Sequence, residues 1–264
     1  MSTITERKAY ASDLTNPQWQ ILEPLLPEQK EGGRERRVDL REIINAINYR
    51  TRTGCAWEML PHDLPAKSTV YEYYRSWQGD GTWQRVHDVL RSQVRQQEGR
   101  DVNASAGMLD SQSVKTVETR GERGYDAGKK IKGRKRHLLV DTLGLIIAVV
   151  VTVASVQDRD GGKLVFSSVG DEPRLEKVWA DGGYRGEFLA WTKEHCAWEV
   201  EIVLRTPDQK GFVVLPRRWV VERTFAWLGR CRRLAKDWEK SILSAESWLL
   251  VAHIKMVSRR LVRG

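Results

Sequence analysis

Two different hydrophobic periods divide this chain. Between residues 14 and 97, apolar residues recur every three or four positions, which is the spacing of one face of a helix. From Met108 onward, short runs of apolar and β-branched residues predominate, as is typical of strands. The pattern predicts a helical N-terminal domain at residues 1–100 and an α/β domain at residues 101–264, joined by the polar segment 98–107.

Helix-capping residues bound the first predicted elements. Thr15 or Asn16 can accept a hydrogen bond from the first turn of a helix that ends at Pro27. Asp39 can cap a second helix, and Gly54 ends it because glycine readily adopts the left-handed conformation found after a helix. Both predictions rest on local hydrogen bonding alone.

A third helix is predicted to open at Ser68 and end near Asp80, and a fourth begins at Thr82. The third helix follows the second after a short turn and leaves Lys67 and Arg75 free to point outwards. Two helices with a basic, hydroxyl-bearing second member are what a helix-turn-helix DNA reader needs. A plain helical bundle without a ligand remains the alternative.

Short apolar runs predict the sheet of the second domain. Residues 108–110 form a strand that ends in an acid, and residues 137–142 and 145–153 form a β-hairpin. The basic segment 115–136 is expected to be an excursion from the sheet. The remaining predicted elements are a weak helix after residue 157, a strand at 177–180, a helix at 184–195, a strand at 198–204, and helices at 216–238 and 245–261.

Composition excludes several classes of protein. The chain is 41% hydrophobic and 30% charged, as in ordinary globular proteins. Its longest apolar run, residues 143–151, is far shorter than the roughly 20 residues that span a bilayer, so no membrane contact is predicted. The N-terminus lacks the apolar core of a secretory signal, which predicts a cytoplasmic protein. Three scattered cysteines without a Cys-x-x-Cys pair argue against disulfides and structural zinc.

The net charge of +9 is concentrated in two segments. Residues 205–264 contain fourteen Lys or Arg against five Asp or Glu, and residues 115–136 contain nine against three. A nucleic acid is the natural partner of such surfaces, because phosphate neutralisation releases counterions. The eleven tryptophans sit mostly at helical spacing, so they are expected in the core rather than as base-stacking platforms.

Three acids stand where a metal site would need them. Asp110 and Asp181 each end a predicted strand, which brings them to one edge of an open α/β sheet, where ligands bind. Glu222 lies among arginines on the predicted helix 216–238, with Arg218, Gly229 and Arg233 close to the same face. Three carboxylates suit Mg2+ or Mn2+, and two ions about 4 Å apart can catalyse phosphodiester cleavage.

Each acid also has a simpler interpretation. Asp181 precedes two glycines and could be a turn residue, Asp110 could end its strand without a ligand, and Glu222 could pair with Arg218 along the helix. Among competing acids, Asp141 is interpreted as a hairpin-turn residue. Asp158 and Asp160 could cap the next helix or stand beside the site.

Several motifs together resemble a known family. The segments that carry the resemblance are LTNPQWQILEPLLP, INAINYRTRTGCAWEMLP, STVYEYYRSW, LDSQSVKT, GRKRHLLVDTLG, QDRDG, WADGGYRG and WVVERTFAWLGRCRRLAKDWE. In this combination and order they resemble bacterial insertion-sequence DDE transposases of the insertion sequence five group, over about residues 14–240. The resemblance implies a ribonuclease H-like catalytic domain with a mixed sheet flanked by helices, two Mg2+ or Mn2+ ions, cleavage at transposon ends and joining of the 3′ ends to target DNA.

By position, the resemblance makes Asp110, Asp181 and Glu222 the catalytic carboxylates and metal ligands. Arg218 stands four residues before Glu222, as in the family signature, whereas Gly229 occupies its lysine position. The DNA-contacting residues expected from the resemblance and from the basic segments are Lys67, Ser68, Thr69, Arg75, Lys135, Arg136, Arg218, Arg230 and Arg233. Terminal inverted repeats and target DNA are the expected partners, with a homodimer in the DNA complex. A non-catalytic helix-turn-helix regulator and a metal-dependent nuclease without strand transfer remain the alternatives.

Overall fold

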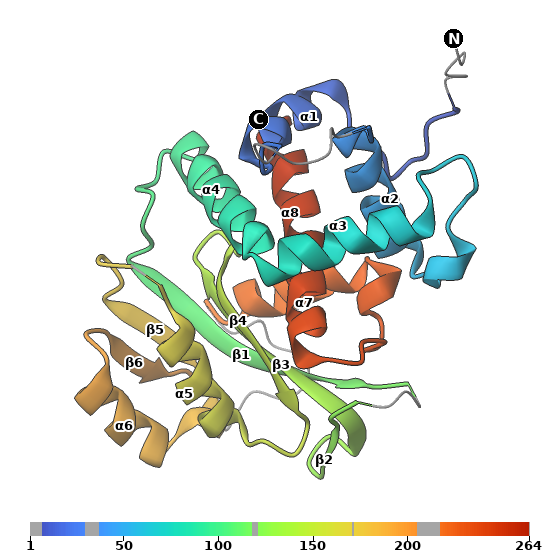
Figure 1. Cartoon of the computed structure of the whole chain (residues 1–264). Coiled ribbons are helices and arrows are strands. Elements are labelled where there is room, and N and C mark those ends of the chain that lie inside the picture. The colour runs from blue at the N-terminus through green and yellow to red at the C-terminus, as the bar shows by residue number, and fades with distance from the viewer. Residues whose placement is uncertain (1–6, 30–36, 118–120, 171, 205–216, 264) are drawn as a thin grey trace.

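The computed structural model describes residues 7–29, 37–117, 121–170, 172–204 and 217–263. A curved six-stranded sheet lies below a group of helices drawn from both ends of the chain (Figure 1). The helices are α1 (Asn16–Leu22), α2 (Leu40–Thr53), α3 (Lys67–Gly79), α4 (Thr82–Gln97), α5 (Asp158–Ser168), α6 (Glu187–His195), α7 (Trp219–Gly229) and α8 (Ile242–Leu261). The predicted fold class, a helical N-terminal region followed by a mixed sheet with flanking helices, is confirmed.

The sheet mixes parallel and antiparallel pairs. Its strands are β1 (Ala106–Lys115), β2 (Gly124–Asp126), β3 (Ile131–Asp141), β4 (Ile146–Val153), β5 (Lys177–Ala180) and β6 (Glu199–Ile202). The order is β2-β3-β1-β5-β6, with β4 also paired to β3. Strand β1 pairs antiparallel with β3 and parallel with β5, and β6 pairs parallel with β5. Strand β1 is therefore central and carries the residues around Asp110.

The capping residues predicted from the sequence bound α1 and α2 in the structure. Thr15 caps α1 in a capping box with Gln18, and the Asp39 carboxylate accepts a hydrogen bond from the Arg41 amide. Gly54 follows α2 with φ of +74°, the left-handed conformation that glycine adopts at low cost. Helix α3 begins one residue before the predicted Ser68 and without a side-chain cap.

Two sequence expectations about the elements between residues 115 and 238 are wrong. The segment 115–136 is not wholly an excursion, because β2 lies within it and β3 begins at Ile131. The predicted helix 216–238 is broken: α7 ends at Gly229, and a short 3-10 turn follows at Arg232–Leu234. Arg233 is therefore not on the helix face that carries Glu222. The helical pattern continued past Gly229 because the apolar spacing is also satisfied by the turn.

The two faces of the sheet have separate cores. Met108, Leu138 and Val140 contribute to a core with α7, α8 and the N-terminal helices, whereas Leu109 and Leu139 pack with α5 and α6. The alternation follows from strand geometry, since successive side chains point to opposite faces. Of the helices in the described ranges, none combines the length and the apolar character that crossing a lipid bilayer requires.

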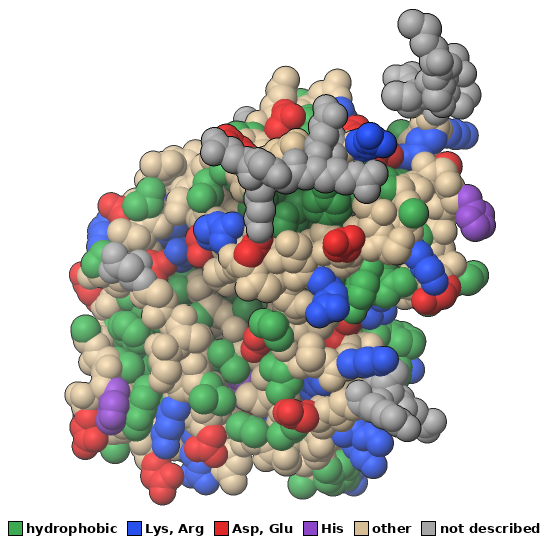
Figure 2. Space-filling model, in the orientation of Figure 1, with side chains coloured by type: hydrophobic (Ala, Val, Ile, Leu, Met, Phe, Trp, Pro, Cys, Tyr) green, Lys and Arg blue, Asp and Glu red, His purple; other side chains and the backbone are tan. Residues whose placement is uncertain are grey.

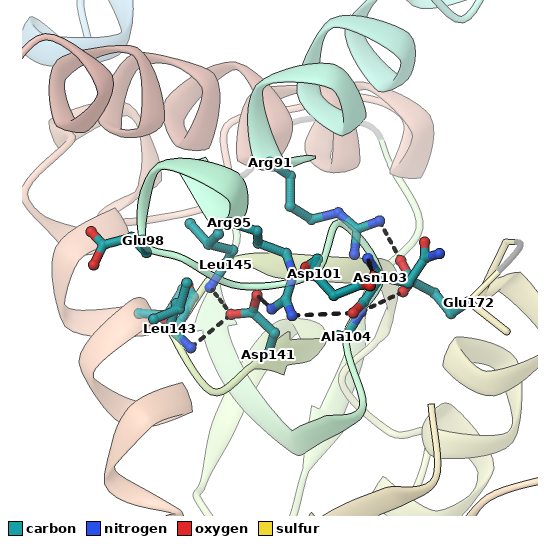
Figure 3. Close-up of polar contacts among 12 residues, drawn as sticks. Arg91, Arg95, Glu98, Asp101, Asn103, Ala104, Asp141, Leu143, Leu145 and Glu172 are labelled. Atoms are coloured by element: carbon teal, nitrogen blue, oxygen red, sulfur yellow. Dashed lines mark hydrogen bonds and ion pairs between the residues drawn. The ribbon is translucent and has the colours of Figure 1, made fainter. Parts of the chain in front are cut away.

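Buried ion pairs join α4 to the second domain (Figure 3). Arg95 pairs with Asp141, and their side chains are 5% and 0% exposed. Arg91 pairs with Glu172 in the same region. Asp141 also accepts hydrogen bonds from the hairpin-turn amides, as its predicted role requires. The division of the chain at residue 100 stays a prediction, because the N-terminal helices share a core with α7 and α8.

Candidate active site

Asp110 and Asp181 stand on neighbouring strands at the same level of the sheet. In the parallel pair of β1 and β5, Met108 lies opposite Trp179. Two residues further along each strand are Asp110 and Asp181, and the two-residue period keeps them on the face of Met108 and Trp179. That face packs in the core that also contains residues of α7. Both carboxylates therefore lie on the side of the sheet that α7 covers.

The position of Asp181 follows from local sequence, whereas that of Asp110 does not. Asp181 comes directly after β5, as predicted, and accepts a hydrogen bond of 2.8 Å from the Gly183 amide at the following turn. Asp110 was predicted to end a short strand. It is instead the fifth residue of the ten-residue β1, which continues to Lys115. The longer strand arises because residues 107–115 pair with β3.

Burial keeps Asp110 from ionising easily. Its pKa is raised to about 6, first by burial and further by the negative charge of Asp181. A hydrogen bond from the Ser111 amide and the positive charges of Arg218 and Lys129 oppose this rise in pKa. A cation placed beside Asp110 would favour its charged form.

An arginine, Arg218, connects Glu222 to Asp181. Glu222 lies in the first turn of α7, and its side chain is half exposed. The guanidinium of Arg218, the residue just before α7, is 3.6 Å from the Glu222 carboxylate and 3.7 Å from that of Asp181. Arg218 thus spans the gap between a helix and a strand end.

A third aspartate stands beside the site. Asp158, in the first turn of α5, accepts a hydrogen bond of 2.7 Å from the Ser111 hydroxyl and pairs with Lys135 at 3.0 Å. Burial raises the pKa of Tyr184 well above its ordinary value, and the charges of Asp110, Asp158 and Asp181 raise it further. The Tyr184 ring is fully buried.

Of the two roles considered for Asp158, the structure supports a place beside the site. Its side chain does not cap α5, whose preceding residue Gln157 also makes no side-chain cap. A side chain at Gly183 would meet Asp181 at 3.0 Å and Asp158 at 3.4 Å, so glycine lets both carboxylates approach the same turn. The sequence did not single out Ser111 or Tyr184. Their only signal is proximity in the chain to Asp110 and Asp181.

The carboxylate oxygens of the site are the type of ligand that a hard divalent cation prefers. Carboxylate oxygens are the ligands that Mg2+ and Mn2+ prefer, and the neighbouring charges of Asp110 and Asp181 favour a cation. In the present arrangement, no group of three or more acidic, His or Cys side chains among the described residues converges closely enough to hold a metal ion. Arg218 lies between Asp181 and Glu222, so a shared ion requires its guanidinium to move aside.

Three of the cations expected to contact DNA are buried. Lys135 donates to the Val156 carbonyl and pairs with Asp158, and Arg136 donates to the Leu234 carbonyl. Arg233 is 7% exposed and pairs with Glu239. These three side chains have internal partners, so we leave them out of the DNA surface proposed below. Sequence alone could not show this, because basic strand residues look the same whether they face solvent or the core.

The other expected DNA contacts are at the surface. Arg230 is exposed at the end of α7. Lys67 and Ser68 are exposed in the first turn of α3, and Lys67 pairs loosely with Glu58 at 3.3 Å. Thr69 is half-buried and Arg75 is exposed. The side chain of Arg218 is 17% exposed and lies between Asp181 and Glu222. Figure 2 shows basic and acidic side chains interspersed over one face of the molecule.

Comparisons with known proteins converge on one family. Residues 14–87 match a family model described as a putative transposase of the IS4/5 family, and residues 103–256 match the transposase DDE domain. A Burkholderia cepacia protein described as an insertion element IS402 uncharacterized 16.2 kDa protein is 32% identical over 106 residues. The match covers 38% of this chain and 70% of that relative.

Proposed function

This chain belongs to the DDE transposase family, of the IS4/5 type that its motifs predict, and we propose that it cleaves DNA at insertion-sequence ends and joins the 3′ ends to target DNA. Its function is DNA transposition, and DNA is its partner. The fold agrees with the ribonuclease H-like architecture of the family. Asp110, Asp181 and Glu222 are the proposed catalytic carboxylates.

One observation supports this assignment most directly. Asp110 and Asp181 lie at one level of adjacent strands, and Arg218 connects Asp181 to Glu222. One guanidinium thereby joins Asp181 to Glu222, and Asp110 lies on the strand next to the one that Asp181 follows. The simpler interpretations describe part of this geometry, since Asp181 accepts from the turn amide of Gly183 and Glu222 pairs with Arg218 along the helix, but they do not explain why one arginine joins the two acids.

Asp110, Asp181 and Glu222 would hold Mg2+ or Mn2+, in two positions. Two ions held by these carboxylates would stabilise the charge that develops on the oxygens of a phosphodiester during its cleavage. The chain itself supplies carboxylates in a fixed orientation: the Gly183 amide holds Asp181, and the Ser111 amide holds Asp110 with a hydrogen bond of 2.7 Å. Asp110 must lose its proton to act as a ligand, so its raised pKa of about 6 means that protons compete with a metal ion below that pH.

Arg218 has two proposed roles. In the DNA-free chain it compensates the charges of Asp181 and Glu222. When DNA is bound, its guanidinium is placed to donate to a backbone phosphate beside the carboxylates, which positions the strand. The proposed DNA surface also includes Arg230 and the exposed first turn of α3, with residues 1–100 as the end-binding domain and a homodimer bringing two ends together.

The cleavage experiment uses a duplex that carries an insertion-sequence end. We expect Asp181→Ala to abolish Mg2+-dependent cleavage while end binding changes by less than about threefold, because the acid serves catalysis rather than affinity. Asp160→Ala, an exposed acid of α5, is the matched control and should cleave normally. Unchanged cleavage by Asp181→Ala would remove the assignment. Cleavage without a joined product would instead identify a nuclease.

A further inference from the structure

A cavity of about 600 Å3 lies beside the C-terminal half of α8. Helix α7, the turn between β3 and β4, and the end of α2 also contribute to its wall. Of its fourteen lining residues, all within the described part of the chain, six are Lys or Arg and none is Asp or Glu. The six are Arg52, Arg230, Lys255, Arg259, Arg260 and Arg263. We call this the basic cavity.

Half of these cations are held by main-chain carbonyls. Three donate hydrogen bonds of 2.8–3.2 Å to main-chain carbonyls: Lys255 to Asn48, Arg52 to Arg230, and Arg259 to Ala11. Within the described ranges, Arg260 alone of the six pairs with a carboxylate, that of Glu98 at 2.8 Å. A carbonyl orients a cation without neutralising its charge, so the cavity keeps a positive potential.

The pKa of Lys255 reflects that positive potential. Lys255 belongs to α8, and its side chain is almost fully buried. Burial lowers its pKa to about 8, and the positive charges of Arg259 and Arg52 lower it further. An ammonium group kept among like charges away from water is stabilised by an anion.

An aromatic and cationic stack on α7 reaches this cavity. The Arg223 guanidinium carbon lies 4.4 Å from the Trp219 ring centre and 4.5 Å from that of Trp227. Trp227 also lines the basic cavity, and Trp219 is 40% exposed. The expectation that tryptophans at helical spacing lie in the core is therefore wrong for Trp219. Such a stack offers faces on which nucleobases can lie.

Helix geometry sets the distance between the two sites. Glu222 and Arg230 are eight residues apart along α7 and its final turn, which corresponds to about 12 Å at 1.5 Å per residue. Phosphates of one strand follow each other every ~3.4 Å along a duplex, so this is roughly three to four nucleotide steps. A strand that passes the carboxylates along α7 reaches the basic cavity within that length.

We infer that the basic cavity binds the sugar-phosphate backbone of a DNA strand that leaves the carboxylates along α7. The inference rests on the proposed function only in taking the strand to be the one that is cleaved. A strand fits the observations better than a free nucleotide. The exposed Arg52, Arg230 and Arg263 extend the positive charge from the buried Lys255 to the surface. The stack lies on α7, the helix that also carries Glu222.

The test measures binding of a fluorescently labelled single-stranded DNA oligonucleotide to the full chain by anisotropy, in EDTA and over a series of salt concentrations. The double variant Arg230→Gln/Arg259→Gln should weaken binding about tenfold and reduce the salt slope by about 1.4, since each phosphate contact on a single strand contributes about 0.7. The control Arg232→Gln/Lys193→Gln removes the same charge from exposed residues outside the cavity and should change binding by less than about twofold. Arg230 is exposed, so folding is not at stake in the single variant Arg230→Gln, which should show a smaller loss of the same kind.

Two results would overturn the inference. Equal losses in the two double variants would mean that DNA responds to total charge only. Displacement of the oligonucleotide by inorganic phosphate or thymidine monophosphate at similar molar concentration would make this a free-anion site rather than a strand site. Because no cleavage is measured, the outcome is independent of the carboxylate assignment: cavity-dependent binding would survive a failure of Asp181→Ala to abolish cleavage.

Discussion

The guanidinium of Arg218 lies 3.7 Å from the carboxylate of Asp181, across the gap between the start of α7 and the end of β5. The same group is 3.6 Å from Glu222. One arginine thus compensates two acids from different elements. A metal ion that binds these acids must compete with Arg218, because the ion and the guanidinium interact with the same carboxylate oxygens.

Arg218→Gln should therefore bind Mn2+ more tightly than the unaltered chain when DNA is absent, by about three- to tenfold. The competing charge is worth on the order of 1 kcal/mol in a partly exposed pair. Calorimetric titration of Mn2+ measures the change. Arg217→Gln is the control, because this neighbour lies 4.2 Å above the Trp179 ring and pairs with neither acid. Weaker Mn2+ binding by Arg218→Gln would show that the arginine supports the metal site instead.

His137 should make stability depend on pH. Burial lowers its pKa to about 4, partly opposed by the charge of Asp158, whereas an unfolded histidine has a pKa near 6.5. Between these values the unfolded chain binds more protons, so the free energy of unfolding rises as pH increases from about 4 to 6.5. Asp110, with its raised pKa of about 6, contributes a slope of opposite sign over part of this range.

The comparison of His137→Gln with the unaltered chain isolates the histidine. In urea unfolding at several pH values, the free energy of unfolding of the unaltered chain minus that of His137→Gln should increase with pH up to about 6.5 and stay constant above it. Asp110 and the other groups cancel in that difference. A difference that does not vary with pH would mean that His137 titrates normally.

The buried pair of Arg95 and Asp141 should be expensive to break. Arg95→Met leaves an uncompensated carboxylate with no exposed surface, which costs about 3–5 kcal/mol. Arg85→Met, at an exposed position of the same helix, removes two surface hydrogen bonds and should cost about 1 kcal/mol or less. In urea unfolding, the double variant Arg95→Met/Asp141→Asn should lose less than the sum of its single variants, because the buried charge is then absent. Additive losses would show that the pair does not couple α4 to the sheet.

Gly161→Ala should destabilise the chain through His137. A methyl group at Gly161 would stand 2.0 Å from the buried imidazole ring, so the ring or α5 must shift, at a cost of about 1–3 kcal/mol. Gly79→Ala is the matched control in α3, where a methyl group meets nothing within 4 Å and should stabilise by about 0.5–1 kcal/mol. Thermal unfolding of both variants gives opposite shifts if this packing is right.

Part of the candidate site is readable from local sequence. Asp181 follows a short apolar run and precedes two glycines, which is enough to place it at a strand end with its carboxylate over the next turn. The position of Asp110 inside β1 is not readable in this way. Strand length depends on pairing with β3, whose residues lie more than twenty positions away. The proposed ligand role of these acids stays a prediction.

The exposure of basic side chains is the property that the sequence predicts least well. The run that contains Lys135 and Arg136 predicts an exposed basic surface, yet both side chains are buried with internal acceptors. Conversely, the cations of the basic cavity lie in or directly after α2, α7 and α8, so no single segment of the sequence predicts the cavity. Burial of a charge is set by what packs over it, and those neighbours come from distant parts of the chain.

The sequence by itself determined the helix caps at Thr15 and Asp39, the helix end at Gly54, the β3-β4 hairpin and the family. These depend on hydrogen bonds and hydrophobic periods within a few residues, or on motifs in order. Only the tertiary structure decided that Arg218 joins Asp181 to Glu222, and which arginines face solvent. Those outcomes depend on side-chain contacts between elements far apart in sequence, which no local pattern encodes.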